Sequence, residues 1–462
     1  MYIDQLYTDC LAEAAYYIES NKEVAIIDPM RDIDVYLEMA ARRGAKIKYI
    51  LETHFHADFV SGHLDLAKAT GAPIIFGPGA ETKFPIVNVK DDEILPLGNI
   101  NIQVLHTPGH TPESVSFLIF DEDNIEHSVF TGDTLFIGDV GRPDLLGGKM
   151  TKEELAGMLY DSLNNKIKIL PDHVIVYPGH GAGSACGKNI SKEKTSTIGK
   201  QKETNYALQE MSRKEFIEVV TKGLANPPLY FPFDAGKNKS GYALLTEVLA
   251  KSSTPLNPAE FERVLKHNCF VLDTRSASKF AKGFVKGAIN VGLDGQYASW
   301  VGNLVPPNAN ILLVTEPGKE NESIVRLARI GYDSVSGYLE GGMEAWVKAK
   351  LEIDVVNEIK AKDFVQETEK GSLHILDVRS KGECESGIVK GAKAICLSQL
   401  GSRLHELSPK LTYYVHCAGG YRSMMACSLL KKNNFNHVIN VEGGMQMLKK
   451  LKVPTESSCA IG

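Results

Sequence analysis

An internal repeat constrains the fold of this chain more than any other feature of its sequence. Residues 270–288, FVLDTRSASKFAKGFVKGA, match residues 374–392, HILDVRSKGECESGIVKGA, at nine of nineteen positions with an offset of 104 residues. A second block, YLEGGMEAW at 338–346, is similar to NVEGGMQML at 440–448 with an offset of 102. Two matched blocks in the same order indicate two copies of one domain of about 100 residues.

Each copy alternates short apolar segments with helical patterns. In the second copy, residues 374–378 and 412–417 predict buried strands, residues 423–434 predict a helix, and residues 437–444 predict a strand and turn. Strand–helix alternation of this kind indicates a mostly parallel sheet covered by helices.

The first 240 or so residues differ in character, because most of their predicted strands end in a turn that carries His, Asp or Gly. The strand candidates are residues 23–29, 46–54, 74–77, 100–108, 115–120, 128–136 and 174–180. Residues 223–245 are rich in Pro, Gly and Asn and are expected to join this region to the repeats.

Composition excludes several classes of protein. A length of 462 residues suggests about three domains. The formal net charge of −6 argues against a nucleic-acid binder, and no apolar run reaches the ~18 residues that would span a membrane. The N-terminus lacks a secretory pattern, and the eight cysteines are sparse and lack paired spacings. We therefore expect a cytoplasmic protein without nucleic-acid or membrane partners.

Four polar clusters follow predicted strands in the N-terminal region. They are Thr53 to Asp58, Thr107 to His110, Thr131 to Asp133, and Tyr177 to His180. A strand end holds a ligand rigidly, and the turn after it brings ligands to one rim of the sheet. Imidazole and carboxylate are suitable donors for a first-row transition metal. One such cluster could be structural, but four together predict a metal site.

These residues resemble the metallo-β-lactamase superfamily, whose T-H-x-H-x-D-H motif is matched from Thr53 to Asp58. Position 59 is Phe where two-metal members usually have His. The remaining pattern is similar to the persulfide dioxygenases of that superfamily. This resemblance implies one Fe(II) per chain, with His54, His110 and Asp133 as ligands in a two-His-one-carboxylate arrangement.

The other polar residues of the clusters have two interpretations. His56, Asp58 and His180 would orient the ligands of the iron site. A mononuclear zinc site that uses His54, His56 and His110 would fit the same residues.

Two features bear on the substrate. Arg142, in the segment from Asp139 to Asp144, could bind a carboxylate of the thiol carrier, as the resemblance implies, or pair with Asp144 on the surface. Cys186 lies in a loop of small residues after His180 and could act as a relay thiol, or could be a small buried apolar residue.

One cysteine of the repeat stands between a predicted strand and a helix. Cys417 begins the loop Cys-Ala-Gly-Gly-Tyr-Arg, in which the backbone N–H groups around Gly419 and Gly420 and the helix N-terminus would favour a thiolate and stabilise a persulfide. The stretch is similar to the active loop of rhodaneses. This resemblance makes Cys417 the catalytic nucleophile and Gly419, Gly420 and Arg422 binding residues.

The first copy provides an internal comparison. Alignment of residues 311–323 with the loop of the second copy places Glu316 opposite Cys417. The loop has no cysteine and carries acidic side chains, which would repel anionic sulfur donors. We expect an inactive rhodanese.

The combined resemblance implies an α/β architecture of three domains. A metallo-β-lactamase-like αββα sandwich would occupy residues 1–245, an inactive rhodanese-like domain residues 246–355, and an active rhodanese residues 356–462. The fusion would oxidise a low-molecular-weight persulfide of glutathione, coenzyme A or a similar thiol with O2, giving sulfite and free thiol. Cys417 would transfer sulfane sulfur to sulfite, giving thiosulfate. The resemblance also implies a homo-oligomer.

Two alternatives remain open. One is a zinc thioester hydrolase of glyoxalase II type fused to a sulfurtransferase, against which Phe59 argues. The other is a non-enzymatic sulfur carrier or persulfide sensor with a structural metal, against which the open two-His-one-carboxylate set argues.

Overall fold

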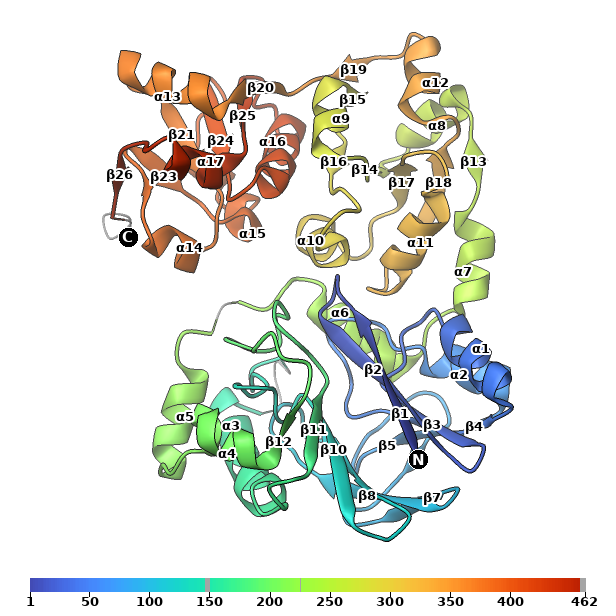
Figure 1. Ribbon diagram of the computed structural model, residues 1–462. Coiled ribbons are helices and arrows are strands. Elements are labelled where there is room, and N and C mark those ends of the chain that lie inside the picture. Colours follow the sequence, from blue (N-terminus) through green and yellow to red (C-terminus); the bar gives the residue numbers. More distant parts are fainter. Residues whose placement is uncertain (146–149, 225, 458–462) are drawn as a thin grey trace. The chain divides into compact units, whose positions relative to one another are not determined.

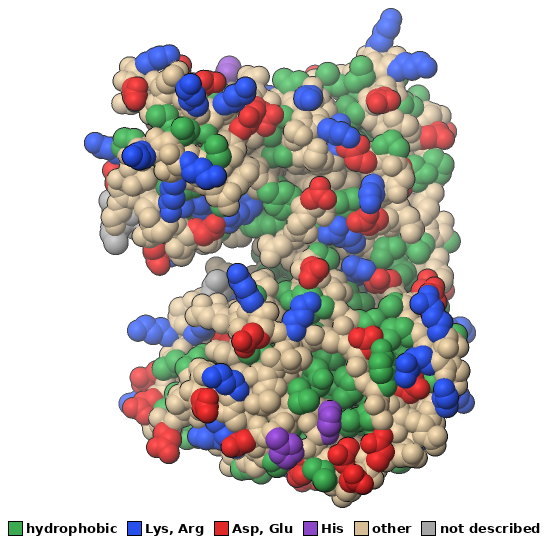
Figure 2. Space-filling view, in the orientation of Figure 1, with side chains coloured by type: hydrophobic (Ala, Val, Ile, Leu, Met, Phe, Trp, Pro, Cys, Tyr) green, Lys and Arg blue, Asp and Glu red, His purple; other side chains and the backbone are tan. Residues whose placement is uncertain are grey.

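A computed structural model describes residues 1–145, 150–224 and 226–457. The chain forms two compact units, one of residues 1–248 and 325–333, and the other of residues 249–324 and 334–462. None of the helices in the described part of the chain has the length and apolar character needed to cross a membrane. On the face drawn in Figure 2, basic and acidic side chains are interleaved.

The first unit contains two six-stranded sheets (Figure 1). The first has the order β1-β2-β3-β4-β5-β6, with strands Tyr2–Thr8, Glu13–Ser20, Glu23–Ile27, Lys46–Leu51, Ile74–Phe76 and Val87–Asn88. The second has the order β12-β11-β10-β9-β8-β7; in chain order, β7 to β12 are Ile94–Leu97, Ile100–His106, Val115–Phe120, Glu126–Gly132, Ile175–Pro178 and Ser196–Thr197. The expected strands are therefore present, and β1, β2, β6, β7 and β12 are added to them.

Three apolar clusters hold this unit together. One lies between the sheets and joins residues such as Ile18 and Ile27 to Val104 and Phe117. The outer face of the first sheet packs against α1 (Asp34–Arg43) and α2 (His63–Thr70). The outer face of the second packs against α3 (Lys152–Ser162), the π-helix at Leu163–Ile167, α4 (Ile198–Thr204) and α5 (Arg213–Thr221). The layers are helix, sheet, sheet and helix, which is the predicted αββα sandwich.

The segment that was expected to be a linker contains a helix. Residues Phe231–Ser240 form α6, with Phe231, Asp234 and Asn238 buried. The side chain of Asn238 donates hydrogen bonds to the carbonyl oxygens of His56 and Phe59 and accepts one from the Ser61 N–H. The helix α6 therefore supports the loop that carries the first histidines. Pro, Gly and Asn lower helix propensity, and packing overrides that preference here.

The two repeats fold alike, as five-stranded parallel sheets with equivalent strand orders, β13-β18-β17-β14-β16 and β20-β25-β24-β21-β23. The first contains β13 (Pro255–Leu256), β14 (Phe270–Asp273), β16 (Ile289–Asn290), β17 (Ile311–Val314) and β18 (Val335–Leu339), with helices α7 (Leu245–Ser252), α8 (Pro258–Leu265), α9 (Ala277–Lys282), α10 (Tyr297–Leu304), α11 (Glu320–Ala328) and α12 (Gly342–Lys348) around it. The second contains β20 (Asn357–Lys360), β21 (His374–Asp377), β23 (Ala392–Ala394), β24 (Tyr413–His416) and β25 (Val438–Glu442), with helices α13 (Ala361–Lys370), α14 (Lys381–Glu385), α15 (Leu397–Leu400), α16 (Tyr421–Lys432) and α17 (Gly444–Lys450). Each copy also has an antiparallel pair, β15 (Phe284–Val285) with β19 (Ile353–Asp354) and β22 (Ile388–Val389) with β26 (Thr455–Glu456).

Sheet register corrects the expected alignment of the two loops. Asp273 of β14 pairs with Val314, whereas the equivalent Asp377 of β21 pairs with His416. Thr315, and not Glu316, is therefore opposite Cys417. The alignment compared thirteen residues with twelve, and only the strand pairing fixes where the extra residue lies.

Candidate functional site

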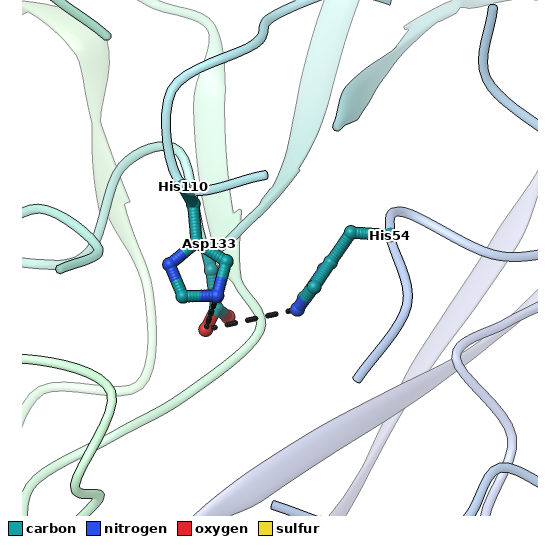
Figure 3. Close-up of side chains that lie close together, drawn as sticks. All are labelled: His54, His110 and Asp133. Atoms are coloured by element: carbon teal, nitrogen blue, oxygen red, sulfur yellow. Dashed lines mark ion pairs between the residues drawn. The ribbon is translucent and has the colours of Figure 1, made fainter. Parts of the chain in front are cut away.

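Three side chains converge at the rim between the two sheets of the first unit (Figure 3). His54 follows β4, His110 follows β8, and Asp133 follows β10. Oδ2 of Asp133 lies 3.3 Å from Nε2 of His110 and 3.9 Å from Nε2 of His54. All three side chains are buried, and this carboxylate oxygen has no hydrogen-bond partner among the described residues. Two imidazole nitrogens and an unpartnered carboxylate oxygen fit a metal ion.

Neighbouring groups fix the tautomers of both histidines. The Thr53 hydroxyl donates to Asp28 at 2.8 Å, so it accepts from Nδ1 of His54 at 2.9 Å. Nδ1 of His110 donates to the carbonyl oxygen of Arg142 at 2.8 Å. In both rings Nε2 therefore keeps its lone pair and faces Asp133, as a metal ligand requires.

The backbone at Asp133 needs a glycine before it. Gly132 has a φ of +48°, and a Cβ there would lie 2.6 Å from Oγ1 of Thr53. The Thr-Gly-Asp sequence thus allows the end of β10 to approach the loop that carries His54.

The charges of the site residues depend on burial and on the ion pairs of His180 with Asp133 and Asp58. Burial, and next the nearby His56, lower the pKa of His54, and burial lowers that of His110. Burial alone would raise the pKa of Asp133, but His180 and then His110 hold it well below the usual value. Burial would lower the pKa of His180, but its contacts with Asp133 and Asp58 raise it. The site therefore has neutral His54 and His110, an anionic Asp133 and a cationic His180.

A second cluster lies directly behind Asp133. Nδ1 of His180 contacts Oδ1 of Asp133, and Nε2 contacts Oδ2 of Asp58, each at 2.8 Å. The thiol of Cys186 lies in the same buried cluster as Asp58 and His180. Burial and next Asp58 raise its pKa, which keeps it a neutral thiol.

His56 belongs to a third group of side chains. Its Nε2 lies 3.0 Å from Oδ1 of Asp28 and 3.6 Å from Oε2 of Glu52, and its ring packs on Phe59 with centroids 4.3 Å apart. The Nε2 atom of His56 therefore groups with Asp28 and Glu52, although the rings of His56 and His54 are in contact, with centroids 4.2 Å apart.

Arg142 is buried in this region. Its guanidinium binds both oxygens of Asp144, at 2.6 and 2.8 Å, and the carbonyl oxygen of Ala185 at 3.2 Å. Its backbone N–H donates to the carbonyl oxygen of Cys186. The carbonyl oxygen of Arg142 accepts the bond from Nδ1 of His110, so the Arg142 backbone holds the His110 ring in place.

The loop of the second copy directs a backbone N–H group at the sulfur of Cys417. The N–H of Gly420 donates to Sγ of Cys417 at 3.1 Å, and Gly420 has a φ of +110°, a left-handed conformation that favours glycine. Oγ of Ser423 lies 3.6 Å from the same sulfur. Side-chain atoms of Gln446 flank the position of Gly419.

Arg422 at the end of this loop binds Glu383 of α14 through both of its terminal nitrogens, at 2.6 and 2.7 Å. The ion pair, with burial acting against it, lowers the pKa of Glu383 to about 2. Sequence reasoning missed Glu383, because nothing in the motif around Cys417 indicates which residue of α14 faces the loop. It also missed Asp28, which contacts Thr53 and His56, although its position just after β3 is the same kind of signal as the positions of His54, His110 and Asp133 after their strands.

Comparison with known proteins identifies two families in the chain. The model of the metallo-beta-lactamase superfamily matches residues 8–180, and the rhodanese-like domain matches residues 257–349 and 360–450. A probable hydroxyacylglutathione hydrolase of Schizosaccharomyces pombe is 34% identical over 166 residues, 35% of this chain, so that the chain spans only 60% of that relative. The mitochondrial persulfide dioxygenase of Bos taurus is 29% identical over 211 residues, 44% of this chain and 72% of that protein.

Among solved structures, a metallo-β-lactamase of Staphylococcus aureus is 33% identical, with a TM-score of 0.66. The match covers 73% of this chain and 98% of that one. The chain therefore belongs to the metallo-β-lactamase superfamily, and two rhodanese-like domains follow its metallo-β-lactamase domain.

Proposed function

We propose that this protein is a persulfide dioxygenase fused to a sulfurtransferase. The observation that carries the proposal is the direction of His56, whose Nε2 turns toward Asp28 and Glu52, while His54, His110 and Asp133 form a set of two imidazoles and one carboxylate. Such a set is typical of non-haem Fe(II) sites that react with O2. A hydrolase with two metals would need more ligands, and Phe59 is not one.

The overall reaction is RSSH + O2 + H2O → RSH + SO3²⁻ + 2H⁺, in which the outer sulfur is oxidised and O2 is reduced. A ferrous ion held by His54, His110 and Asp133 would supply the electron-transfer chemistry that side chains lack. The bond from His180 keeps Asp133 anionic, and burial keeps water from the site. Arg142 and the Cys186 thiol, beside this cluster, would contact the substrate.

The second reaction belongs to Cys417. Its thiolate attacks the sulfane sulfur of RSSH, so that the new S–S bond forms as RS⁻ leaves. Sulfite then takes that sulfur as thiosulfate and regenerates the thiolate. The N–H of Gly420 at 3.1 Å stabilises negative charge on Sγ, and Gly419, Gly420 and Arg422 would bind the anionic donor.

A second candidate is a thioester hydrolase with zinc as its metal, which the likeness to hydroxyacylglutathione hydrolases favours. One experiment separates the two. Anaerobically purified, Fe(II)-loaded protein is given glutathione persulfide or coenzyme A persulfide, and oxygen uptake, sulfite and thiosulfate are measured. We expect oxygen uptake that His110→Ala abolishes and that the exposed His173→Gln control retains.

Thiosulfate should form only while Cys417 is intact, with sulfite accumulating in Cys417→Ser. Hydrolysis of a glutathione thioester without oxygen uptake from either persulfide would overturn the dioxygenase proposal. Persulfide on Cys417 with neither activity would instead indicate a sulfur carrier.

A further inference from the structure

The helix α16, which begins at the loop of Cys417, is hydrogen-bonded to the first rhodanese-like copy along one of its faces. The residues involved are seven and four positions apart, which places them on the same side of a helix. The three bonds are Tyr421 Oη to the Gly292 carbonyl oxygen at 2.8 Å, the Asn290 N–H to Ser428 Oγ at 3.1 Å, and Lys432 Nζ to the Gly287 carbonyl oxygen at 3.2 Å. All three partners lie on or beside β16.

The contact at Tyr421 is the one nearest to the loop. Its ring lies over two glycines of the first copy, since a Cβ built on Gly292 or Gly295 would come within 3.5 or 3.4 Å of ring carbons. Gly295 also has a φ of +105°, which favours glycine. The ring of Tyr421 thus packs on the backbone of the first copy, and that backbone also accepts a hydrogen bond from its hydroxyl.

Tyr421 directly follows Gly420, whose N–H donates to Sγ of Cys417. The left-handed backbone of Gly420 gives little stiffness of its own. Fixing the first residue of α16 therefore fixes the direction of the N–H that faces the sulfur.

We infer that the first copy, which has no cysteine in its own loop, positions the active loop of the second copy through Tyr421. Tyr421 is a positioning residue, since its hydroxyl and its ring contact Gly292 and Gly295 of the first copy. The inference rests on the proposed sulfur transfer at Cys417 and adds a role for the copy that lacks this cysteine.

Two matched variants test the inference in the full-length protein. Tyr421→Phe removes only the hydroxyl, and Ser428→Ala removes the acceptor of the Asn290 N–H, two turns further along α16 from the loop. Three quantities are measured for each variant: the thermal unfolding midpoint, kcat and KM for sulfur transfer to sulfite, and the rate at which iodoacetamide alkylates Cys417, followed by mass spectrometry of its peptide. We expect Tyr421→Phe to lower kcat and the alkylation rate by about threefold to tenfold with little change in KM.

Ser428→Ala should lower the unfolding midpoint at least as much and leave both rates within about twofold. Unchanged rates in Tyr421→Phe, or equal slowing in both variants, would overturn the inference in favour of simple packing between the copies. Alkylation is independent of sulfur transfer. Slower alkylation in Tyr421→Phe combined with no transfer by the wild type would therefore count against the proposed function and not against the positioning role.

Discussion

The ion pair between Arg422 and Glu383 decides how much positive charge the loop around Cys417 offers to a sulfur donor. With the pKa of Glu383 at about 2, the carboxylate stays charged at all physiological pH values and neutralises the guanidinium. We measure the reverse of the proposed transfer, with thiosulfate as the sulfur donor to Cys417. We expect Glu383→Gln to raise kcat/KM for thiosulfate by about threefold to tenfold, because a dianion then meets an uncompensated cation. The gain should shrink at high salt.

The matched control for this prediction is Glu385→Gln, since Glu385 is an exposed acid on the same helix, α14. It should change kcat/KM by less than about twofold. If both variants change kcat/KM equally, the effect comes from the overall electrostatic potential of the surface and not from the ion pair.

His63 predicts a pH dependence of stability in the first unit. Burial lowers its pKa to about 3, and its ring stacks on Phe84. The unfolded chain takes up a proton near pH 6.5, whereas the folded chain does not, so the free energy of unfolding falls as the pH falls from 6.5 toward 3. The loss between pH 6.5 and 5 amounts to at most about 2 kcal/mol.

Urea unfolding of the metal-free protein at pH 7.5 and pH 5 measures this loss. His63→Phe keeps an aromatic ring and removes the proton, so its midpoint should fall less between the two pH values than that of the wild type. An identical fall in both proteins would show that other groups carry the pH dependence.

The residues that could be predicted from the sequence are those at the ends of strands. His54, His110 and Asp133 each follow an apolar segment, and strand ends meet at one rim, so their convergence is a consequence of local pattern. The direction of His56 could not be predicted, because it depends on Asp28, which comes from another segment of the chain. The same holds for Tyr421, whose partner lies 129 residues away.

At the scale of elements, the two copies build equivalent sheets because their matched blocks contain equivalent elements. These are the buried strand, β14 or β21, and the turn before the last helix, α12 or α17. That turn has a specific task in the second copy. Gly444, with a φ of +49°, begins α17, and the N–H of the next residue donates to the Cys417 carbonyl oxygen at 2.7 Å. A Cβ on Gly444 would lie 2.3 Å from that same oxygen.

Gly444→Ala is therefore expected to displace the loop of Cys417. Sulfur transfer should fall more than about tenfold, because the alanine requires both a strained backbone and a shift of the loop. The control is Gly342→Ala in the first copy, with a similar φ of +57° and the Thr315 carbonyl oxygen 3.3 Å from its Cβ. It imposes the same backbone strain, so retained transfer in the control would assign the loss to the loop.

Helix α6 shows where element prediction fails. Its sequence, FPFDAGKNKS, lacks the apolar periodicity of a surface helix. It is stabilised instead by specific polar contacts of Asn238 with the loop of His56. Such contacts between segments about 180 residues apart leave no local signal.

At the scale of the whole molecule, the compact units do not follow the boundaries of the repeat. Residues 325–333, which are part of the first copy in sequence, group with the first unit. The fully buried Arg31 binds this segment within the first unit. It donates to the Ala328 carbonyl oxygen at 2.8 Å and to Asp333. It also donates to the Ala243 carbonyl oxygen.

This partition predicts that residues 325–333 lose their structure together with the first unit. Arg31→Met removes the donor to Oδ1 of Asp333 and to the carbonyl oxygens of Ala328 and Ala243, while Lys237 still binds the other oxygen of Asp333. The loss should cost the first unit about 2–3 kcal/mol. In hydrogen exchange, amides of residues 325–333 should then lose protection in parallel with those around Arg31, while amides of β24 keep theirs. Arg42→Met, which breaks only the exposed pair with Glu38, should change nothing measurable. If the amides of 325–333 instead follow β24, this segment is stabilised by its own repeat, and the buried arginine serves the first unit alone.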